Sequence, residues 1–147
     1  MDKEKHRYRV IFRSNWKFEL EALRRSWRYS SKKVKIFVYA SFPLLAILAV
    51  LLVLHNIQRH DYILAIFWIL YPFVPILHLI ARLKPKTYET SLRGLIIDGQ
   101  LHRWKNYKGY FADGEMLYLI NWTGGVIVLP QRFEDVIKEF VPKLPNL

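Results

Sequence analysis

The stretch IFVYASFPLLAILAVLLVLHNI, residues 36–57, contains no Asp, Glu, Lys or Arg. A second stretch of the same kind, YILAIFWILYPFVPILHLIA, covers residues 62–81. A lipid bilayer has a hydrocarbon core about 30 Å thick, which a helix of about 20 apolar residues crosses. Both stretches have this length, and a soluble chain of 147 residues has too small a core to hide two such helices. We therefore expect an integral membrane protein and exclude an ordinary soluble enzyme.

The four residues 58–61 are too few to form anything but a tight turn, so the two spans, 36–57 and 62–83, should form an antiparallel hairpin. The first span follows a long basic segment and has the length of a full span, so we expect a retained anchor rather than a cleaved signal peptide. Pro72 and Pro75 lie three residues apart in the second span. They should kink this helix, and we expect the kink in the third of the span nearest its C-terminal end, residue 83.

The basic residues flank this hairpin. Residues 1–35 carry 12 Lys or Arg against 4 Asp or Glu, and residues 82–147 carry 10 against 7. The turn holds Arg59 and Asp61 and has no net charge. Segments rich in Lys and Arg stay in the cytoplasm. We therefore expect both termini in the cytoplasm, and we attribute much of the net charge of +11 to topology.

The segment before the first span predicts a strand and a helix. Residues 7–13 are aromatic and β-branched with rough alternation, and Ser14 or Asn15 can cap a following helix. Apolar residues then recur at helical spacing, at Trp16, Leu20, Leu23 and Trp27. This stripe can be a packing face, the face of a helix lying on anionic lipid, or both at once. On lipid, Trp would sit at the interface and the cations off the stripe would face phosphates: Lys17, Arg24 and Arg28.

Six cations open the first span or close the second, and an antiparallel hairpin would bring them to one membrane surface. They are Lys32, Lys33, Lys35, Arg82, Lys84 and Lys86. The simplest interpretation is a basic anchor that fixes the topology, and the alternative is specific recognition of lipid headgroups. With Trp16 and Trp27, these residues are our candidates for contact with lipid headgroups or with an interface.

The residues after the second span predict a small β-rich domain. Asp98-Gly99 and Thr123-Gly124-Gly125 each separate two strand-like runs, as the turns of β-hairpins do. Residues 134–141 predict a short amphipathic helix with acids in its first turn. Residues 106–115 are rich in Tyr, Gly and Asp and predict a loop or a broken strand. The tail thus amounts to about four strands and a helix.

The predicted fold class is an α+β membrane protein in three parts. Residues 1–35 form a cytoplasmic strand and amphipathic helix, residues 36–83 a transmembrane hairpin, and residues 84–147 a cytoplasmic β domain with a terminal helix. Since the two cytoplasmic segments flank the hairpin, strand 7–13 can join the sheet of the tail. One composite domain would then lie under the membrane.

Catalytic signatures are missing from the sequence. The absence of cysteine excludes disulfides, thiolate metal sites and a cysteine nucleophile. No phosphate-binding glycine loop, zinc-protease motif or Gly-x-Ser-x-Gly elbow occurs. Neither apolar run holds an acidic residue, which weighs against ion transport through this hairpin alone. We expect a protein that is not an enzyme and that has no cofactor.

The histidines leave one alternative open. His55 lies at the outer end of the first span and His78 near the inner end of the second, so one chain cannot clamp a haem between them. His55, His60 and Asp61 around the turn would make a weak metal shell, and the simpler interpretation is a solvent-facing cap. A component that holds haem or metal only between chains is therefore our second alternative function.

The order of these segments resembles small prokaryotic membrane proteins of the YcxB-like type. In the closing segment 126–133, Pro130, Arg132 and Phe133 match that family's Pro-Lys-Arg-x-Phe-like sequence, with Gln131 in place of the basic residue and one residue fewer before Phe. Trp104 stands where the family often has a Trp that opens a strand. The resemblance implies a pleckstrin-homology-like (PH-like) half-barrel tail, a location in the prokaryotic inner membrane, and a membrane-anchored interaction module without enzyme activity.

Our leading functional hypothesis is an accessory or scaffold subunit of a larger membrane complex. Aromatic residues make up 16% of the chain, and Trp and Tyr are favoured at protein interfaces. The tail supplies four candidates for contact with another subunit or a second copy: Trp104, Tyr107, Tyr110 and Phe111. The first alternative is a stand-alone protein that binds or senses anionic lipid. Nucleic acid is not expected as a partner, because the tail has little net charge and is tethered beside a membrane.

Overall fold

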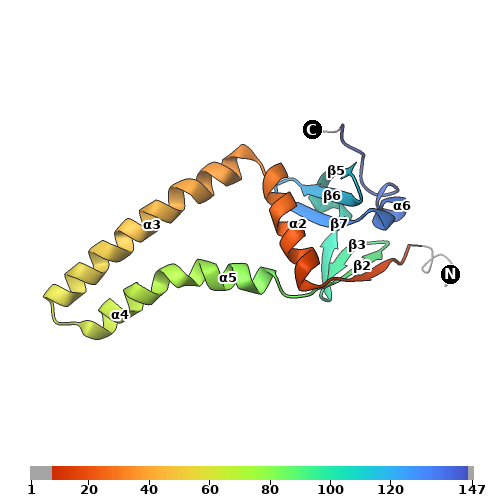
Figure 1. Ribbon diagram of the computed structural model, residues 1–147. Helices are drawn as coiled ribbons and strands as arrows, with labels where there is room; N and C mark the ends of the chain where they lie inside the picture. Colours follow the sequence, from red (N-terminus) through yellow and green to blue (C-terminus); the bar gives the residue numbers. More distant parts are fainter. Residues whose placement is uncertain (1–7, 146–147) are drawn as a thin grey trace. The chain divides into compact units, whose positions relative to one another are not determined.

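The protein consists of two compact units, seen in a computed structural model that describes residues 8–145 (Figure 1). The hairpin unit is residues 32–83, and the terminal unit is formed by residues 8–31 and 84–145, which flank it in the sequence. The chain is a mixed α+β protein with two long apolar helices and antiparallel sheets, so this coarse prediction of fold class is confirmed.

The hairpin unit holds two helices that are long and apolar enough to cross a membrane. The first is α3 (Lys32–Gln58), which contains Pro43. The second is interrupted, with α4 (Tyr62–Leu70), the 3-10 turn η1 (Tyr71–Phe73) and α5 (Val74–Arg82) in succession. Proline has no N–H to donate to the preceding turn, so Pro72 and Pro75 explain the break. The break lies at the middle of this helix and not in the third nearest Arg82, where the sequence led us to expect it.

The two helices of the hairpin meet near the turn. The main contacts of α3 are with α4 and η1, and Figure 1 shows α3 and α5 diverging away from the turn. Ala49 and Ala65 are buried, so small side chains let the helices approach closely. Asp61 caps α4 by accepting a hydrogen bond from the Leu64 backbone N–H at 3.3 Å.

The terminal unit contains a four-stranded antiparallel sheet in the order β1-β2-β3-β4. Its strands are β1 (Ile11–Arg13), β2 (Thr87–Ser91), β3 (Gly94–Ile97) and β4 (Gln100–Arg103). Strand β1 pairs with β2, which confirms that the N-terminal strand joins the sheet of the tail. The strand is shorter than predicted, and Arg7 lies outside the described residues. Asp98 and Gly99 have φ of 49° and 81°, as a two-residue turn between β3 and β4 requires.

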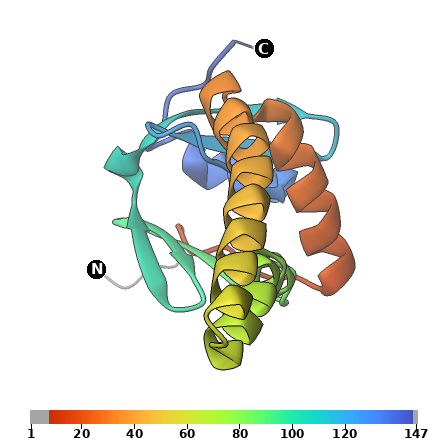
Figure 2. The same cartoon turned by 90° about the vertical axis from the view of Figure 1, so that its left-hand side faces the viewer.

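A second sheet of three antiparallel strands completes the unit. Its strands are β5 (Tyr107–Asp113), β6 (Met116–Asn121) and β7 (Val126–Pro130). The helix α2 (Trp16–Tyr29) lies against β7 (Figure 2). The 3-10 turn η2 (Trp104–Asn106) links the two sheets. A second 3-10 turn, η3 (Gln131–Phe133), and the helix α6 (Glu134–Ile137) follow β7.

The second sheet is buried on both faces. Leu117 and Leu119 of β6 and Leu129 of β7 face the main core, which also includes Phe133 and Ile137. The alternate side chains face α2, where Phe111, Tyr118 and Val128 form a second cluster with Ala22. This alternation is the two-residue period of a strand, with each face covered by a different partner.

Parts of the tail differ from the prediction. The segment 106–115, which we expected as a loop or broken strand, is largely the strand β5, with a register shift between Tyr107 and Gly109. At Gly109 a Cβ would overlap the side chain of Leu144, so the glycine admits the C-terminal segment to the sheet edge. Strand β2 was not predicted, and the helix α6 has only four residues where the sequence indicated 134–141.

A buried carboxylate joins the two segments of the terminal unit. Glu19 of α2 is only 5% exposed. Its Oε1 accepts hydrogen bonds from Ser14 Oγ at 2.5 Å and from Tyr88 Oη at 2.9 Å, and its Oε2 lies 3.2 Å from Lys86 Nζ. The backbones are tied at the same place, since the Ser14 N–H donates to the Lys86 carbonyl at 2.8 Å. The start of α2 is thereby fixed to the strand β2.

Gly94 tests the register of the first sheet. A Cβ at this position would overlap the backbone of His102 and Arg103 on the paired strand β4. We expect Gly94→Ala to lower the free energy of unfolding by about 3 kcal/mol, measured by denaturant titration in detergent with near-UV circular dichroism. Gly114→Ala is the control, because its Cβ meets nothing and only its positive φ costs about 1 kcal/mol. Equal losses in the two variants would contradict this pairing.

Tyr107 and Tyr88 make a matched pair of buried tyrosines. The hydroxyl of Tyr107 has no hydrogen-bond partner among the residues that the structure describes, whereas that of Tyr88 donates to Glu19. We expect Tyr107→Phe to raise the free energy of unfolding by about 1 kcal/mol and Tyr88→Phe to lower it by about 2 kcal/mol. Denaturant titration of both variants at pH 7 measures the difference, and a loss in Tyr107→Phe would be evidence against the orphaned hydroxyl.

Tyr107 also makes the free energy of unfolding depend on pH. Burial raises the pKa of Tyr107 to about 12, so between pH 10 and 12 the folded protein keeps a proton that the unfolded chain releases. The free energy of unfolding should therefore fall as pH rises through this range. The fall should be smaller in Tyr107→Phe.

Candidate functional site

The helix α2 is the element that exposes functional side chains. Its N-cap is Asn15, whose Oδ1 accepts a hydrogen bond from the Phe18 backbone N–H at 2.9 Å, as the sequence suggested. The face that packs on the sheet β5-β6-β7 carries Phe18, Ala22 and Tyr29. These residues have helical spacing, so the sequence contains two apolar sets on one helix.

The apolar stripe that we identified from the sequence is only partly buried. Trp16 is 59% exposed and Leu20 is 48% exposed, while Leu23 and Trp27 are half-buried. The packing interpretation is therefore wrong for Trp16 and Leu20, and the set Phe18, Ala22 and Tyr29 packs on the sheet. The stripe lies on the outer side of α2, and the ammonium of Lys17 lies 5.7 Å from the centre of the Trp16 ring.

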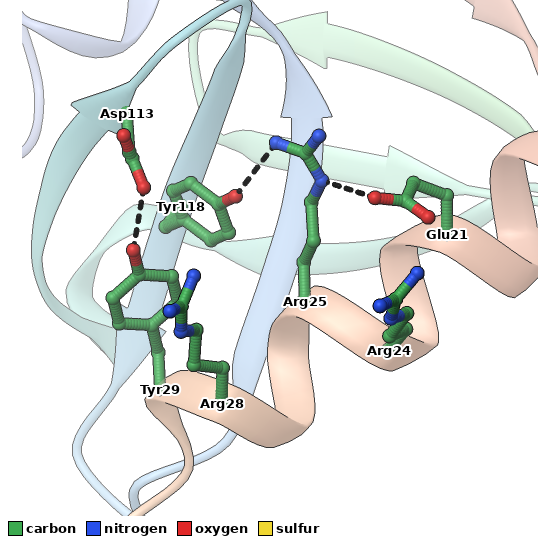
Figure 3. A pocket seen from close by; sticks show the side chains of 7 residues that line it. All are labelled: Glu21, Arg24, Arg25, Arg28, Tyr29, Asp113 and Tyr118. Carbon is green, nitrogen blue, oxygen red and sulfur yellow. Dashed lines mark hydrogen bonds and ion pairs between the residues drawn. The ribbon is translucent and has the colours of Figure 1, made fainter.

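A pocket of about 440 Å³ opens between α2 and the β5–β6 hairpin (Figure 3). Three arginines come from the second half of α2 and two further side chains come from the strands. The lining residues are Glu21, Arg24, Arg25, Arg28, Tyr29, Asp113 and Tyr118. We call it the arginine pocket. It belongs wholly to the terminal unit.

Arg25 is held at the centre of the arginine pocket. Its Nε donates to Glu21 Oε1 at 2.6 Å and its Nη1 donates to the hydroxyl of Tyr118 at 3.4 Å (Figure 3). The hydrogen bond from Arg25 lowers the pKa of Glu21. The bond to Glu21 also raises the pKa of Arg25, so the pair stays charged at neutral pH. The guanidinium is thus fixed from two sides, by a helix residue and a strand residue.

Tyr29 forms the other end of the pocket. Its hydroxyl donates to Asp113 Oδ2 at 2.6 Å. This hydrogen bond raises the pKa of Tyr29. Its ring centre lies 4.8 Å from that of Phe111 and 4.7 Å from that of Tyr118, so aromatic packing fixes the ring.

The arginine pocket is a cationic site. It contains three guanidinium groups against two carboxylates, and each carboxylate already accepts a hydrogen bond from a lining residue. Arg24 is exposed, and Arg24 and Arg28 lie four residues apart, on the same side of the helix. The sequence showed these cations beside the apolar stripe. It did not show that Asp113 and Tyr118, about 90 residues later, complete a pocket with them.

The six cations flanking the spans have different surroundings. Lys32, Lys33 and Lys35 lie in the first turns of α3, and Arg82 is the last residue of α5, all in the hairpin unit. Lys84 belongs to the terminal unit and is exposed. Lys86 is ion-paired to the buried Glu19, so it stabilises the fold and is not a freely available headgroup ligand.

The four aromatic candidates for a partner surface are buried. The exposed fraction is below a tenth for each of Trp104, Tyr107, Tyr110 and Phe111. Trp104 stacks on Phe140, and its indole N–H donates to the Ser91 carbonyl at 3.0 Å. Phe111 belongs to the cluster under α2. These residues therefore form the core of the terminal unit instead of the partner surface that the sequence suggested.

The histidine alternative gains no support within the chain. Among residues 8–145, no group of three or more His, Asp or Glu side chains is arranged to hold a metal ion. His60 Nδ1 lies 3.2 Å from the hydroxyl of Tyr62, which places it in the turn as a local contact. A haem or metal shared between chains remains a prediction about an assembly.

Comparison with known proteins gives this chain no relatives: no family model, no curated protein and no solved structure matches it. The resemblance to YcxB-like proteins stays a prediction that rests on the residues quoted for it. The arginine pocket and the exposed stripe of α2 are the features from which a function can be argued.

The two neighbouring lysines Lys84 and Lys86 separate a structural cation from a surface one. Lys86→Gln removes the cation beside the buried Glu19 and should lower the free energy of unfolding by about 2 kcal/mol. Lys84→Gln is the matched control and should change it by less than about 0.5 kcal/mol, because Lys84 is exposed. Denaturant titration in detergent measures both, and equal small effects would contradict the structural role of Lys86.

Proposed function

We propose that the protein is a non-catalytic interaction module of a prokaryotic inner membrane, which binds the anionic surface of that membrane through the outer face of α2. The two apolar helices would be its transmembrane anchor, with both termini in the cytoplasm. The excess of Lys and Arg in both flanks supports this orientation. The two antiparallel sheets on one core, with a following helix, support the PH-like character that the resemblance implies for the tail.

The exposed stripe of α2 is the observation that carries this proposal. Trp16 and Leu20 are about half exposed although the core of the terminal unit is filled without them. Cations lie off the stripe on the same outer side, at Lys17, Arg24 and Arg28. An apolar face with Trp, bordered by Lys and Arg, is the pattern of a helix that lies in an anionic lipid interface.

The length of the connection to the first span supports lipid as the ligand. Only Ser30 and Ser31 separate α2 from α3. Three Cα–Cα steps cover at most about 11 Å, so Tyr29 stays within that distance of Lys32. If α3 enters the membrane at its basic first turn, the last turn of α2 cannot leave the surface. Juxtamembrane cations gain about 1 kcal/mol each near an anionic leaflet.

An accessory subunit of a larger membrane complex is the second candidate, and one observation favours it. The hairpin unit has an apolar groove of about 320 Å³ between its two helices. The groove is lined by Ala46, Ala49, Val50, Val53, Leu54, Trp68, Ile69 and Pro72. Side chains of a third helix, from a partner subunit or a second copy, would fit such a groove. The burial of the four aromatic candidates removes one of the arguments for this role, because they do not form an exposed partner surface.

The membrane contact of α2 is tested by site-directed spin labelling. Because the chain has no cysteine, Leu20→Cys gives a single nitroxide site in the full-length protein. In nanodiscs of phosphatidylcholine with phosphatidylglycerol, we expect this label to be accessible to oxygen and shielded from a water-soluble nickel chelate. Glu115→Cys, in the exposed turn between β5 and β6, is the control and should be accessible to the chelate.

Two outcomes are informative. A shielded label that becomes exposed when phosphatidylglycerol is omitted would support binding to the anionic surface. A label at position 20 that is as accessible to the chelate as the one at position 115 would refute the proposal. The outer face of α2 would then be left for a protein partner, and the mass of the complex purified in mild detergent would identify it.

A further inference from the structure

We propose that the arginine pocket binds a phosphate group, carried either by an anionic lipid headgroup or by free inorganic phosphate. The inference deepens the proposed function, because it names the chemical group that the α2 region recognises. It rests on that function for the lipid source alone. Binding of inorganic phosphate requires only the terminal unit.

The first argument is the choice and spacing of the cations. Arg24, Arg25 and Arg28 lie within one stretch of five residues of α2 and line one pocket (Figure 3). Arginine presents a planar fork of N–H donors that matches two oxygens of a phosphate, which a lysine cannot do. Like charges four residues apart on a helix repel each other. An anion between Arg24 and Arg28 would be attracted to both guanidinium groups.

The second argument is preorganisation. Arg25 uses two of its five N–H groups, one on Glu21 and one on Tyr118. The pair of bonds fixes its guanidinium between α2 and the strand β6, with further donors left for a ligand. A cation that is already fixed loses little side-chain freedom on binding. The pocket is therefore more than a group of mobile surface charges.

The third argument is the sign of the charge. Glu21 is ion-paired with Arg25, and Asp113 accepts a hydrogen bond from the neutral phenol of Tyr29, so the two remaining arginines face one unpaired carboxylate charge within the lining. The hydrogen bond to Asp113 raises the pKa of Tyr29, and its O–H is directed at that carboxylate. The net charge of the pocket is positive, so it selects an anion over a metal ion. Its volume of about 440 Å³ lies within the ordinary range of ligand sites.

The site can be tested on the whole 147-residue chain in dodecyl maltoside, whose micelles contain no phosphate. In one arm, inorganic phosphate is titrated and its binding is followed by isothermal calorimetry. In the other arm, phosphatidylglycerol is added and bound lipid is counted by native mass spectrometry. The variants are Arg24→Gln and Arg28→Gln. Arg24→Lys is the conservative variant, and Lys108→Gln, on an exposed position of β5, is the matched control.

We expect Arg24→Gln and Arg28→Gln each to weaken binding about tenfold or more, because each removes a charge-assisted hydrogen bond to the anion. Arg24→Lys should restore part of the affinity, since it keeps the charge and loses the fork. Lys108→Gln should bind as the parent does. Near-UV circular dichroism establishes that each variant is folded.

The two arms identify the source of the phosphate. Binding in both arms, with the same dependence on Arg24 and Arg28, supports a site for the phosphate group itself. Binding of phosphatidylglycerol alone with that dependence supports a headgroup site, and binding of inorganic phosphate alone supports a soluble anion. The proposal is overturned if neither ligand binds, or if Lys108→Gln weakens binding as much as Arg24→Gln does. Neither result changes the accessibility expected for the spin label at position 20, so failure of the phosphate site and failure of the membrane contact are distinguishable.

Discussion

The buried carboxylate of Glu19 is the interaction on which the terminal unit depends. It accepts hydrogen bonds from Ser14 and Tyr88 and pairs with Lys86, so one side chain joins residues that are separated by the whole hairpin. A carboxylate this deeply buried is tolerated only when its oxygens are satisfied. The three donors meet this condition together: Ser14 comes from the link between β1 and α2, Lys86 directly precedes β2, and Tyr88 lies at the start of β2. The strand β1, the start of α2 and the strand β2 are held in one arrangement by this group.

The two sides of helix α2 have different surroundings. Its inner side covers the sheet β5-β6-β7 through Phe18, Ala22 and Tyr29. Its outer side leaves Trp16 and Leu20 exposed, and its second half supplies the arginines of the pocket. Because the inner side is locked, the outer side keeps a constant orientation relative to the sheet. The proposed lipid contact and the proposed phosphate site lie on this one rigid element.

Local sequence signals predicted the elements well, and contacts between distant segments limited the rest. The apolar runs predicted both long helices, and Asp98-Gly99 predicted its hairpin, because such signals depend only on neighbouring residues. The sequence left the role of the α2 stripe open because two sets of residues have helical spacing, and only the sheet decides which one is buried. The strand β5 was missed because Gly109, which breaks the pattern, is required by Leu144 from the end of the chain. Arg24 and Arg28 were recognised as cations, but their pocket needs Asp113 and Tyr118 from another segment.

The terminal unit is made of two chain segments that flank the hairpin unit, and this sets the order in which the chain can fold during synthesis. The inner face of α2 is made early, but the strand β7 that it packs against begins at Val126. Translation proceeds at about 5–20 residues per second, so about 100 residues separate the two by roughly 5–20 s. During that interval the hairpin is completed, while Phe18, Ala22 and Tyr29 have no sheet to cover. The terminal unit is therefore the last part of the molecule to form, and newly made α2 must remain soluble, or find a temporary apolar surface, until its sheet arrives.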